Sequence, residues 1–142
     1  MEKEVATMVK GINHVGIVVK NLNEAFSTLG EAFGCEEVYR MEVPQMQQIS
    51  CIVRVGDNCF ELIEPTSEEG PAGQFLKTRG GGIHHISLLC TDLNAVCTRL
   101  ESMGLRIVSK ILDGPFPIAF LHPKSANGVL YELTDRSSLE RP

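Results

Sequence analysis

The chain has no tryptophan, only two tyrosines, and no run of five or more basic residues. Its formal net charge is −5 at pH 7, so we expect neither nucleic acid nor an anionic membrane surface as a partner. No apolar stretch approaches the roughly 20 residues that a transmembrane helix needs. The amino-terminal MEKEVATMVK mixes charges of both signs and lacks the apolar core of a signal peptide. These absences predict a soluble, cytoplasmic protein.

Cysteine pairs of the CxxC type are also missing. The chain has five cysteines, an odd number, at positions Cys35, Cys51, Cys59, Cys90 and Cys97. We interpret them as reduced thiols that fill space in the core of a cytosolic protein. A thiol nucleophile is the alternative interpretation.

What the chain does contain is an internal repeat. Its 142 residues fit one domain, and 43% hydrophobic with 22% charged residues is an ordinary globular balance. Writing GINHVGIVV (11–19) over GIHHISLLC (82–90) places His14 on His85, 71 residues later. CFELIEP over LYELTDR places Glu61 on Glu132 at the same offset of 71. Two histidines and two glutamates in one register indicate a true structural repeat.

Each repeat has the pattern of a strand, a helix and three further strands. β-Branched and apolar residues predict the strands, and an apolar stripe with polar caps predicts the helices. The elements expected in the first half are 12–19, 21–34, 36–43, 48–55 and 58–63. Those expected in the second half are 83–90, 91–104, 105–112, 116–121 and 128–133. The predicted fold class is α+β, with two βαβββ modules paired into an open eight-stranded cup around a metal site.

We expect one domain over residues 1–142, with module one at 11–64, a connector at 65–82 and module two at 83–134. Within the connector, QFLKT predicts a helical turn. In each helix, four apolar residues fall on one stripe that should face the core. They are Leu22, Phe26, Leu29 and Phe33 in the first helix, and Leu93, Val96, Leu100 and Met103 in the second.

The repeated histidines and glutamates are candidate metal ligands. A carboxylate within a strand as apolar as CFELIEP is costly to bury unless it is paired or bound to a metal. If the halves pack around a pseudo-twofold axis, His14, Glu61, His85 and Glu132 converge on one point. Such a set of two nitrogens and two oxygens suits a divalent transition metal. An octahedral ion would keep two positions for substrate oxygens, so we favour Co, Mn, Ni or Fe over a purely structural Zn.

Each of these residues also has a simpler interpretation. A single strand histidine is usually packed or hydrogen-bonded, and a single strand glutamate usually faces solvent. Four such residues related by one offset favour the metal site. Strand alternation selects His85 of the histidine pair as the ligand and places His84 on the other face, with a structural or ligand-supporting role.

At this point the sequence resembles the vicinal oxygen chelate superfamily and, within it, the methylmalonyl-CoA epimerases. The resemblance is carried by INHVGIVVKNL, FELIEP, GPAGQFLKTRGGGIHHISL and FLHPKSANGVLYEL, which together span about residues 11 to 134. It implies one divalent metal (Co, Mn, Ni, Fe or Zn) held by His14, Glu61, His85 and Glu132. It also implies an acyl-CoA thioester substrate, whose α-proton is removed and returned on the other face.

The resemblance bears on four further positions. Lys124 follows the family pattern and either faces the acyl-CoA phosphates or carboxylate, or is a turn lysine in solvent. His122 either lines the pocket or caps the turn before Pro123. Glu132 is a candidate proton shuttle. Gln45 follows Pro44 at the place where the family has a glutamate that is interpreted as the catalytic base.

An amide cannot take up a proton at neutral pH, so Gln45 leaves other reactions open. Also, Gln47 stands where the family usually has glycine. A glyoxalase-type isomerase or lyase, in which Glu132 moves the proton, is one alternative. A non-catalytic small-molecule-binding protein similar to the bleomycin-resistance proteins is another. The complete set of four candidate ligands argues against a binding protein. An extradiol dioxygenase is also disfavoured, because those enzymes hold iron with two histidines and one glutamate. We also expect a homodimer.

Overall fold

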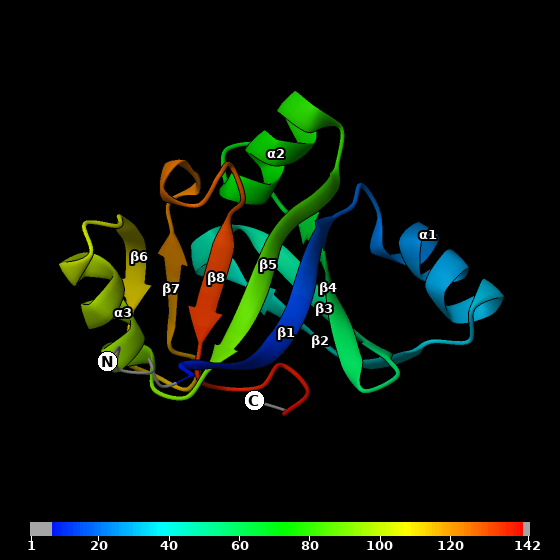
Figure 1. Ribbon diagram of the computed structural model, residues 1–142. Helices are drawn as coiled ribbons and strands as arrows, with labels where there is room; N and C mark the ends of the chain where they lie inside the picture. The colour runs from blue at the N-terminus through cyan, green and yellow to red at the C-terminus, as the bar shows by residue number, and fades with distance from the viewer. Residues whose placement is uncertain (1–6, 141–142) are drawn as a thin grey trace. The chain divides into compact units, whose positions relative to one another are not determined.

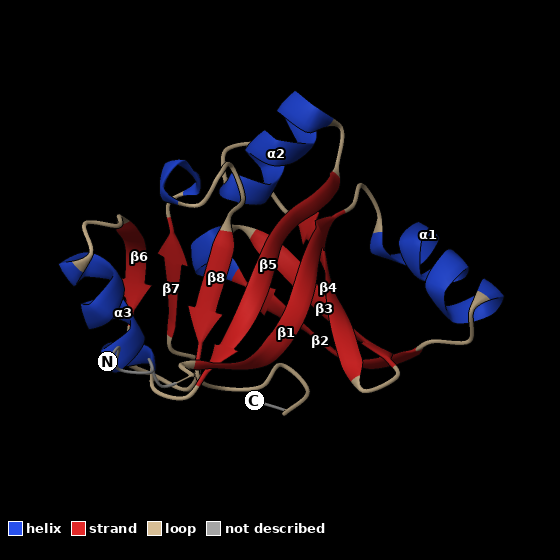
Figure 2. Cartoon of the chain, viewed as in Figure 1, coloured by secondary structure: helices blue, strands red, loops and turns tan. Residues whose placement is uncertain are grey.

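The computed structural model describes residues 7–140; residues 1–6, where we expected no signal peptide, lie outside the described residues. The fold is α+β, and strands make up most of its regular structure (Figure 2). Eight strands are hydrogen-bonded in one open sheet in the order β2-β3-β4-β1-β5-β8-β7-β6 (Figure 1). The predicted fold class, two βαβββ modules with eight strands, is confirmed.

The chain forms two compact units that do not follow the repeat boundaries. The large unit comprises His14–Ile86 with residues 138–140, and the small unit comprises residues 7–13 with Ser87–Ser137. Strands β1 (Val9–Val18) and β5 (Gly82–Cys90) continue from one unit into the other.

The large unit contains most of the first module. In it, β1 pairs in parallel with β4, while β2, β3 and β4 form antiparallel pairs. Its core joins Leu22, Cys51, Val53 and Leu62, which lie on the side of the sheet that faces the first helix. Its other elements are α1 (Leu22–Phe26), η1 (Ser27–Ala32), β2 (Glu36–Val43), η2 (Pro44–Met46), β3 (Gln48–Val55), β4 (Asn58–Pro65) and α2 (Pro71–Arg79).

The helix predicted over 21–34 forms in two parts. Asn21 caps α1, because its side chain accepts a hydrogen bond from the Glu24 backbone N–H at 2.9 Å. After α1 the chain widens into η1, a π-helical segment, where the Phe26 ring occupies the space that a side chain at Gly30 would need. The prediction that the apolar stripe faces the core is wrong at its last residue, since Phe33 is 74% exposed.

α2 is longer than the helical turn expected for QFLKT. It packs against β1 and β4 through a cluster of Val18, Ile63 and Ala72. Val18 and Ile63 face each other in the register of β1 and β4. α2 therefore covers one end of the sheet face that carries His14 and Glu61, since alternate residues share a face.

The small unit contains most of the second module. Asp92 caps α3 by accepting a hydrogen bond from the Ala95 backbone N–H at 3.1 Å. Met103, the last residue of the predicted stripe, is 60% exposed. Phe33 and Met103 are the C-cap residues of η1 and α3, where helical periodicity no longer fixes the direction of a side chain. The elements are α3 (Leu93–Ser102), β6 (Ile107–Ile111), β7 (Ile118–Leu121), η3 (Pro123–Ser125) and β8 (Tyr131–Thr134).

The core of the small unit is formed by α3 and the strands that it covers. Its buried members are Cys90, Leu93, Val96, Cys97, Ala119 and Leu133. Among the described residues, no helix combines the length and the hydropathy that crossing a membrane requires.

Candidate metal centre

Two imidazoles and a carboxylate converge within the large unit. The Nε2 atoms of His14 and His85 lie 2.9 Å apart. Oε1 of Glu61 lies 3.2 Å from Nε2 of His14 and 3.4 Å from Nε2 of His85. Both histidines are 4% exposed, so the three donor atoms meet away from bulk solvent.

Strand register and one glycine bring these side chains together. Glu61 of β4 is directly opposite Gly16 of β1. A Cβ added at Gly16 would collide with the His85 ring, so the imidazole occupies the space where that side chain would stand. Because position 16 has no side chain, His85 on β5 can reach across β1 to Glu61 on β4.

The imidazoles determine the ionisation of Glu61. Burial alone would raise the pKa of this carboxyl group, but the charge and hydrogen bonds of His14 and His85 outweigh burial. The pKa of Glu61 consequently lies well below its ordinary value. Glu61 is therefore ionised at neutral pH, and its carboxylate could serve as an oxygen donor to a metal ion.

The other ring nitrogen of each histidine has a partner of its own. Nδ1 of His14 lies 2.7 Å from Oγ of Ser138, and Nδ1 of His85 lies 2.9 Å from Nδ1 of His84. Burial, with the nearby charge of His85 as a smaller cause, lowers the pKa of His84 to about 4. His84 is therefore neutral at pH 7 and can accept a hydrogen bond. Its ring also meets Phe75 of α2 edge-on, at 4.9 Å between centroids.

Glu132 is buried within the small unit and held by a short chain of hydrogen bonds. It is 8% exposed, and its Oε1 accepts a hydrogen bond from Oγ of Ser87 at 2.8 Å. Asn13 in turn donates to Oγ of Ser87 from its amide nitrogen at 3.1 Å. Together with His14, Glu61 and His85, Glu132 belongs to a group of histidine and glutamate side chains that could hold a metal ion.

The geometry of the donors in the large unit fits a divalent ion. Around an ion with bonds of about 2.1 Å, neighbouring donors lie about 3.0 Å apart at right angles and about 3.4 Å apart at tetrahedral angles. The three distances of 2.9, 3.2 and 3.4 Å lie close to these values or between them. Imidazole and carboxylate suit Mn, Fe, Co, Ni and Zn, and no thiolate is needed.

The other predicted site residues lie on short turns. Gln45 is exposed in the centre of η2, and Gln47, which replaces the family's glycine, has the left-handed φ of 55° that favours glycine. Lys124 is exposed on η3. Nδ1 of His122 accepts a hydrogen bond from the Lys124 backbone N–H at 3.0 Å, so His122 caps the turn that begins at Pro123.

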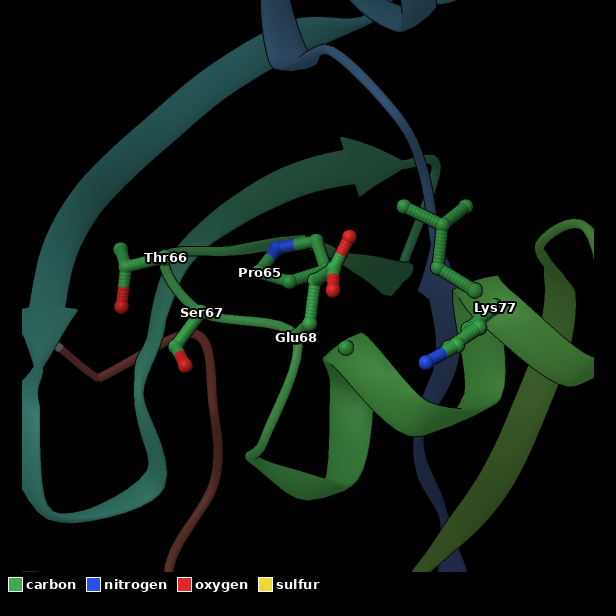
Figure 3. A pocket seen from close by; sticks show the side chains of 7 residues that line it. Pro65, Thr66, Ser67, Glu68 and Lys77 are labelled. Atoms are coloured by element: carbon green, nitrogen blue, oxygen red, sulfur yellow. The ribbon is translucent and has the colours of Figure 1, made fainter.

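A hollow of about 380 Å³ opens in the large unit between the loop after β4 and the helix α2 (Figure 3). Glu68 and Lys77 are the charged residues that line it, and none of the predicted ligands does so. The hollow is therefore not the predicted metal site.

Sequence reasoning missed four supporting residues: Gly16, Ser87, Asn13 and Ser138. The first two could have been found, because Ser87 follows Gly16 by the same 71 residues that separate the histidines. Ser138 had no such signal, since it belongs to neither repeat.

This fold and this donor set define a class of proteins. The family model described as the Glyoxalase/Bleomycin resistance protein/Dioxygenase superfamily matches residues 13–120, and the chain belongs to this superfamily.

Comparison with individual proteins identifies a smaller group within this superfamily. An ethylmalonyl-CoA/methylmalonyl-CoA epimerase of Cereibacter sphaeroides is 34% identical over 131 residues, which cover 89% of this chain and 98% of the relative. The crystal structure of the methylmalonyl-CoA epimerase from Mycobacterium tuberculosis has a TM-score of 0.85 at 31% identity, covering 93% of this chain and 91% of that one. A methylmalonyl-CoA epimerase in complex with methylmalonyl-CoA and NH4+ has a TM-score of 0.85 at 26% identity, with coverages of 96% and 100%. Within the superfamily, the chain belongs with the methylmalonyl-CoA epimerases.

Proposed function

We propose that this protein is a metal-dependent epimerase that acts at the α-carbon of an acyl-CoA thioester of the methylmalonyl-CoA type. The observation that carries the proposal is the convergence of His14, Glu61 and His85, in a chain whose relatives are epimerases. The related structure in complex with methylmalonyl-CoA supports an acyl-CoA as the ligand. These relatives give no support to the two alternatives, which are a glyoxalase-type isomerase or lyase and a non-catalytic small-molecule-binding protein.

His14, Glu61, His85 and Glu132 would hold one divalent ion, for which we favour Co, Mn, Ni or Fe over Zn. The position of Ser87 supports Glu132 as the fourth ligand. Ser87 follows His85 by two residues on β5, so both side chains leave the same face of that strand, and Ser87 donates to Glu132. When bound, the ion acts as a Lewis acid that stabilises the negative charge of the enolate.

The proton chemistry falls to residues on two sides of the substrate. Glu132 takes the α-proton on one face, and the hydrogen bond from Ser87 holds its carboxylate in position for this step. A water molecule on the opposite face donates a proton to the enolate, which inverts the centre, and Glu132 releases the α-proton to solvent, so no atoms are gained or lost. Gln45 orients a substrate oxygen or a water molecule there, because an amide cannot carry the proton itself.

The proposal includes the remaining expectations. Lys124, exposed on η3, offers a cation to the CoA phosphates, and His122 shapes the turn that presents it. Residues 1–142 act as one domain, and the protein works as a homodimer in the cytoplasm. Its five free cysteines, four of them buried, support a reducing compartment.

The test is α-proton exchange in deuterated water. Protein stripped with a chelator would be reloaded with each divalent metal and incubated with a panel of acyl-CoA thioesters and hemithioacetals. We expect metal-dependent deuterium uptake at the α-carbon of malonyl-type thioesters, measured by mass spectrometry. Turnover of hemithioacetals alone would instead establish a glyoxalase, and binding without exchange would establish a binding protein.

A further inference from the structure

After β8 the chain returns to the large unit through a short tail, residues 138–140. Two contacts of Ser138 lie near the candidate ligands. Its Oγ lies 2.7 Å from Nδ1 of His14, and its carbonyl accepts a hydrogen bond from the Tyr39 hydroxyl at 2.9 Å. The tail thus contacts Tyr39 and His14, which precede Ser138 by 99 and 124 positions in the chain.

The contact with His14 has a defined direction when the histidine is a metal ligand. Nε2 must then offer its lone pair, so the ring proton stands on Nδ1. Nδ1–H donates to Oγ of Ser138, which accepts. A partner of this kind fixes both the tautomer and the orientation of a ligating imidazole.

Tyr39 fixes the place of Ser138. In the sheet register Tyr39 of β2 is opposite Ile52 of β3, and Ile52 is opposite Glu61 of β4. Directly opposed residues point to the same face of a sheet, so Tyr39 extends on the face of Glu61. Its bond goes to the backbone carbonyl of Ser138, so Tyr39 does not compete with His14 for the serine hydroxyl.

We propose that Ser138 is a positioning residue for the metal centre: it holds His14 in the Nδ1–H tautomer, and Tyr39 anchors the tail that carries it. This inference rests on the proposed metal-dependent function. It adds a carboxy-terminal element, outside both repeats, to the site.

The first experiment compares metal affinity by isothermal titration with Co²⁺. Ser138→Ala should weaken binding roughly tenfold, as losses of partners behind metal ligands do. Ser138→Thr keeps the hydroxyl and should restore affinity to within about threefold of the natural protein. Ser102→Ala is the matched control, because Ser102 is an exposed serine on α3 whose Oγ donates only to the Arg99 carbonyl among the bonds described; it should change nothing.

The second experiment observes the hydrogen bond itself. In the Zn²⁺-loaded protein, the Nδ1–H proton of His14 should give a downfield NMR resonance that exchanges slowly with water. Exchange should accelerate in Ser138→Ala but not in Ser138→Thr, and Tyr39→Phe should have an intermediate effect. The visible spectrum of the Co²⁺-loaded Ser138→Ala protein should also change, since the orientation of His14 changes.

The outcomes separate the inference from the proposed function. If the natural protein binds Co²⁺ and Ser138→Ala matches it in affinity, spectrum and proton exchange, the role of Ser138 is overturned and the metal centre stands. If the natural protein binds no divalent ion, the proposed function fails and the role of Ser138 fails with it.

Discussion

His14 and His85 occupy equivalent positions in the two repeats, yet different groups hold their imidazoles. Nδ1 of His85 meets His84, the preceding residue of the same strand, at 2.9 Å. Nδ1 of His14 meets Ser138 of the carboxy-terminal tail at 2.7 Å. One support comes from the adjacent residue of the chain, whereas the other comes from a residue 124 positions away. A repeat therefore places equivalent histidines without determining what orients their rings.

The residues two positions after each histidine, Gly16 and Ser87, also differ between the repeats. Gly16 leaves room for the His85 ring, whereas its equivalent in the second repeat, Ser87, carries a hydroxyl that donates to Glu132. Glu61 is surrounded by imidazoles, while one oxygen of Glu132 is held by that serine. The first repeat thus supplies space at this position and the second supplies a hydrogen bond.

The largest expected effect is the loss of the metal, and it should be the same in both repeats. His14→Ala, Glu61→Ala, His85→Ala and Glu132→Ala should each abolish divalent-metal binding and epimerisation, because each removes a proposed ligand. At free metal about 100-fold above the dissociation constant, the natural protein should gain roughly 2.7 kcal/mol of stability, and these variants none. Urea denaturation with and without metal measures the gain. His84→Ala should keep its metal; if it loses the metal while His85→Ala retains it, the ligand assignment is wrong.

Exchanging the residues at the Gly16 and Ser87 positions should have unequal effects. Gly16→Ser forces the His85 ring away from Glu61, which should release the metal and destabilise the fold by about 1–3 kcal/mol through overpacking. Ser87→Gly removes one hydrogen bond to Glu132 and should cost about 1 kcal/mol with weaker metal binding. Chemical denaturation and metal titration of both variants give the comparison. Equal effects would show that the space at Gly16 is not needed.

The third prediction concerns the turn after the second strand of each module, where the residue that follows the proline cannot act as a general base for epimerisation in either repeat. Pro44 is followed by Gln45 in the first repeat, and 71 residues later Pro115 is followed by Phe116. Neither residue can take up a proton, and a positioned general base contributes about 10²–10⁴-fold in rate. We expect weak methylmalonyl-CoA epimerisation and a gain of at least about tenfold in Gln45→Glu. Racemisation of one epimer measures it; a full rate in the natural protein, slowed by Gln45→Glu, would place the base elsewhere.

The smallest expected effect concerns alkaline stability. Burial raises the pKa of Cys51 to about 12 and that of Cys59 to about 11, above their ordinary value of 9.0. Between pH 9 and 11 the unfolded chain loses these thiol protons and the folded chain keeps them, so stability falls as pH rises. Each thiol contributes a slope of up to about 1.4 kcal/mol per pH unit. In urea denaturation from pH 8 to about 10.5, Cys51→Ala should show a flatter decline; an unchanged slope would mean that the folded protein tolerates a thiolate at this position.

Local pattern sufficed for much of the fold. The ranges expected for β2 and β3 agree with the structure. Both strands could be predicted because the apolar residues within each segment and the turn residues beside it are local features of the sequence. Asn21 and Asp92 cap the helices as their side-chain chemistry indicates. The widened turns of η1 did not follow from periodicity, because they depend on how the Phe26 ring packs over Gly30.

For the site, the offset of 71 residues identified the candidate ligands, because both modules place equivalent residues at equivalent points of their strands. What lies behind the ligands could not be deduced in this way. Tyr39 and Ser138 are 99 positions apart, and no periodicity connects a mid-strand tyrosine with a tail serine. Such contacts depend on the path of the chain after its last strand.

The space at Gly16 bears on the history of the chain. A protein with two similar halves can descend from a dimer of one half-length chain, whose gene was later duplicated and fused. In that symmetric dimer, any side chain at this position would have appeared twice, and each copy would have met a histidine. In a fused chain the two positions have separate codons, so one can be glycine beside His85 while the other is the serine that donates to Glu132.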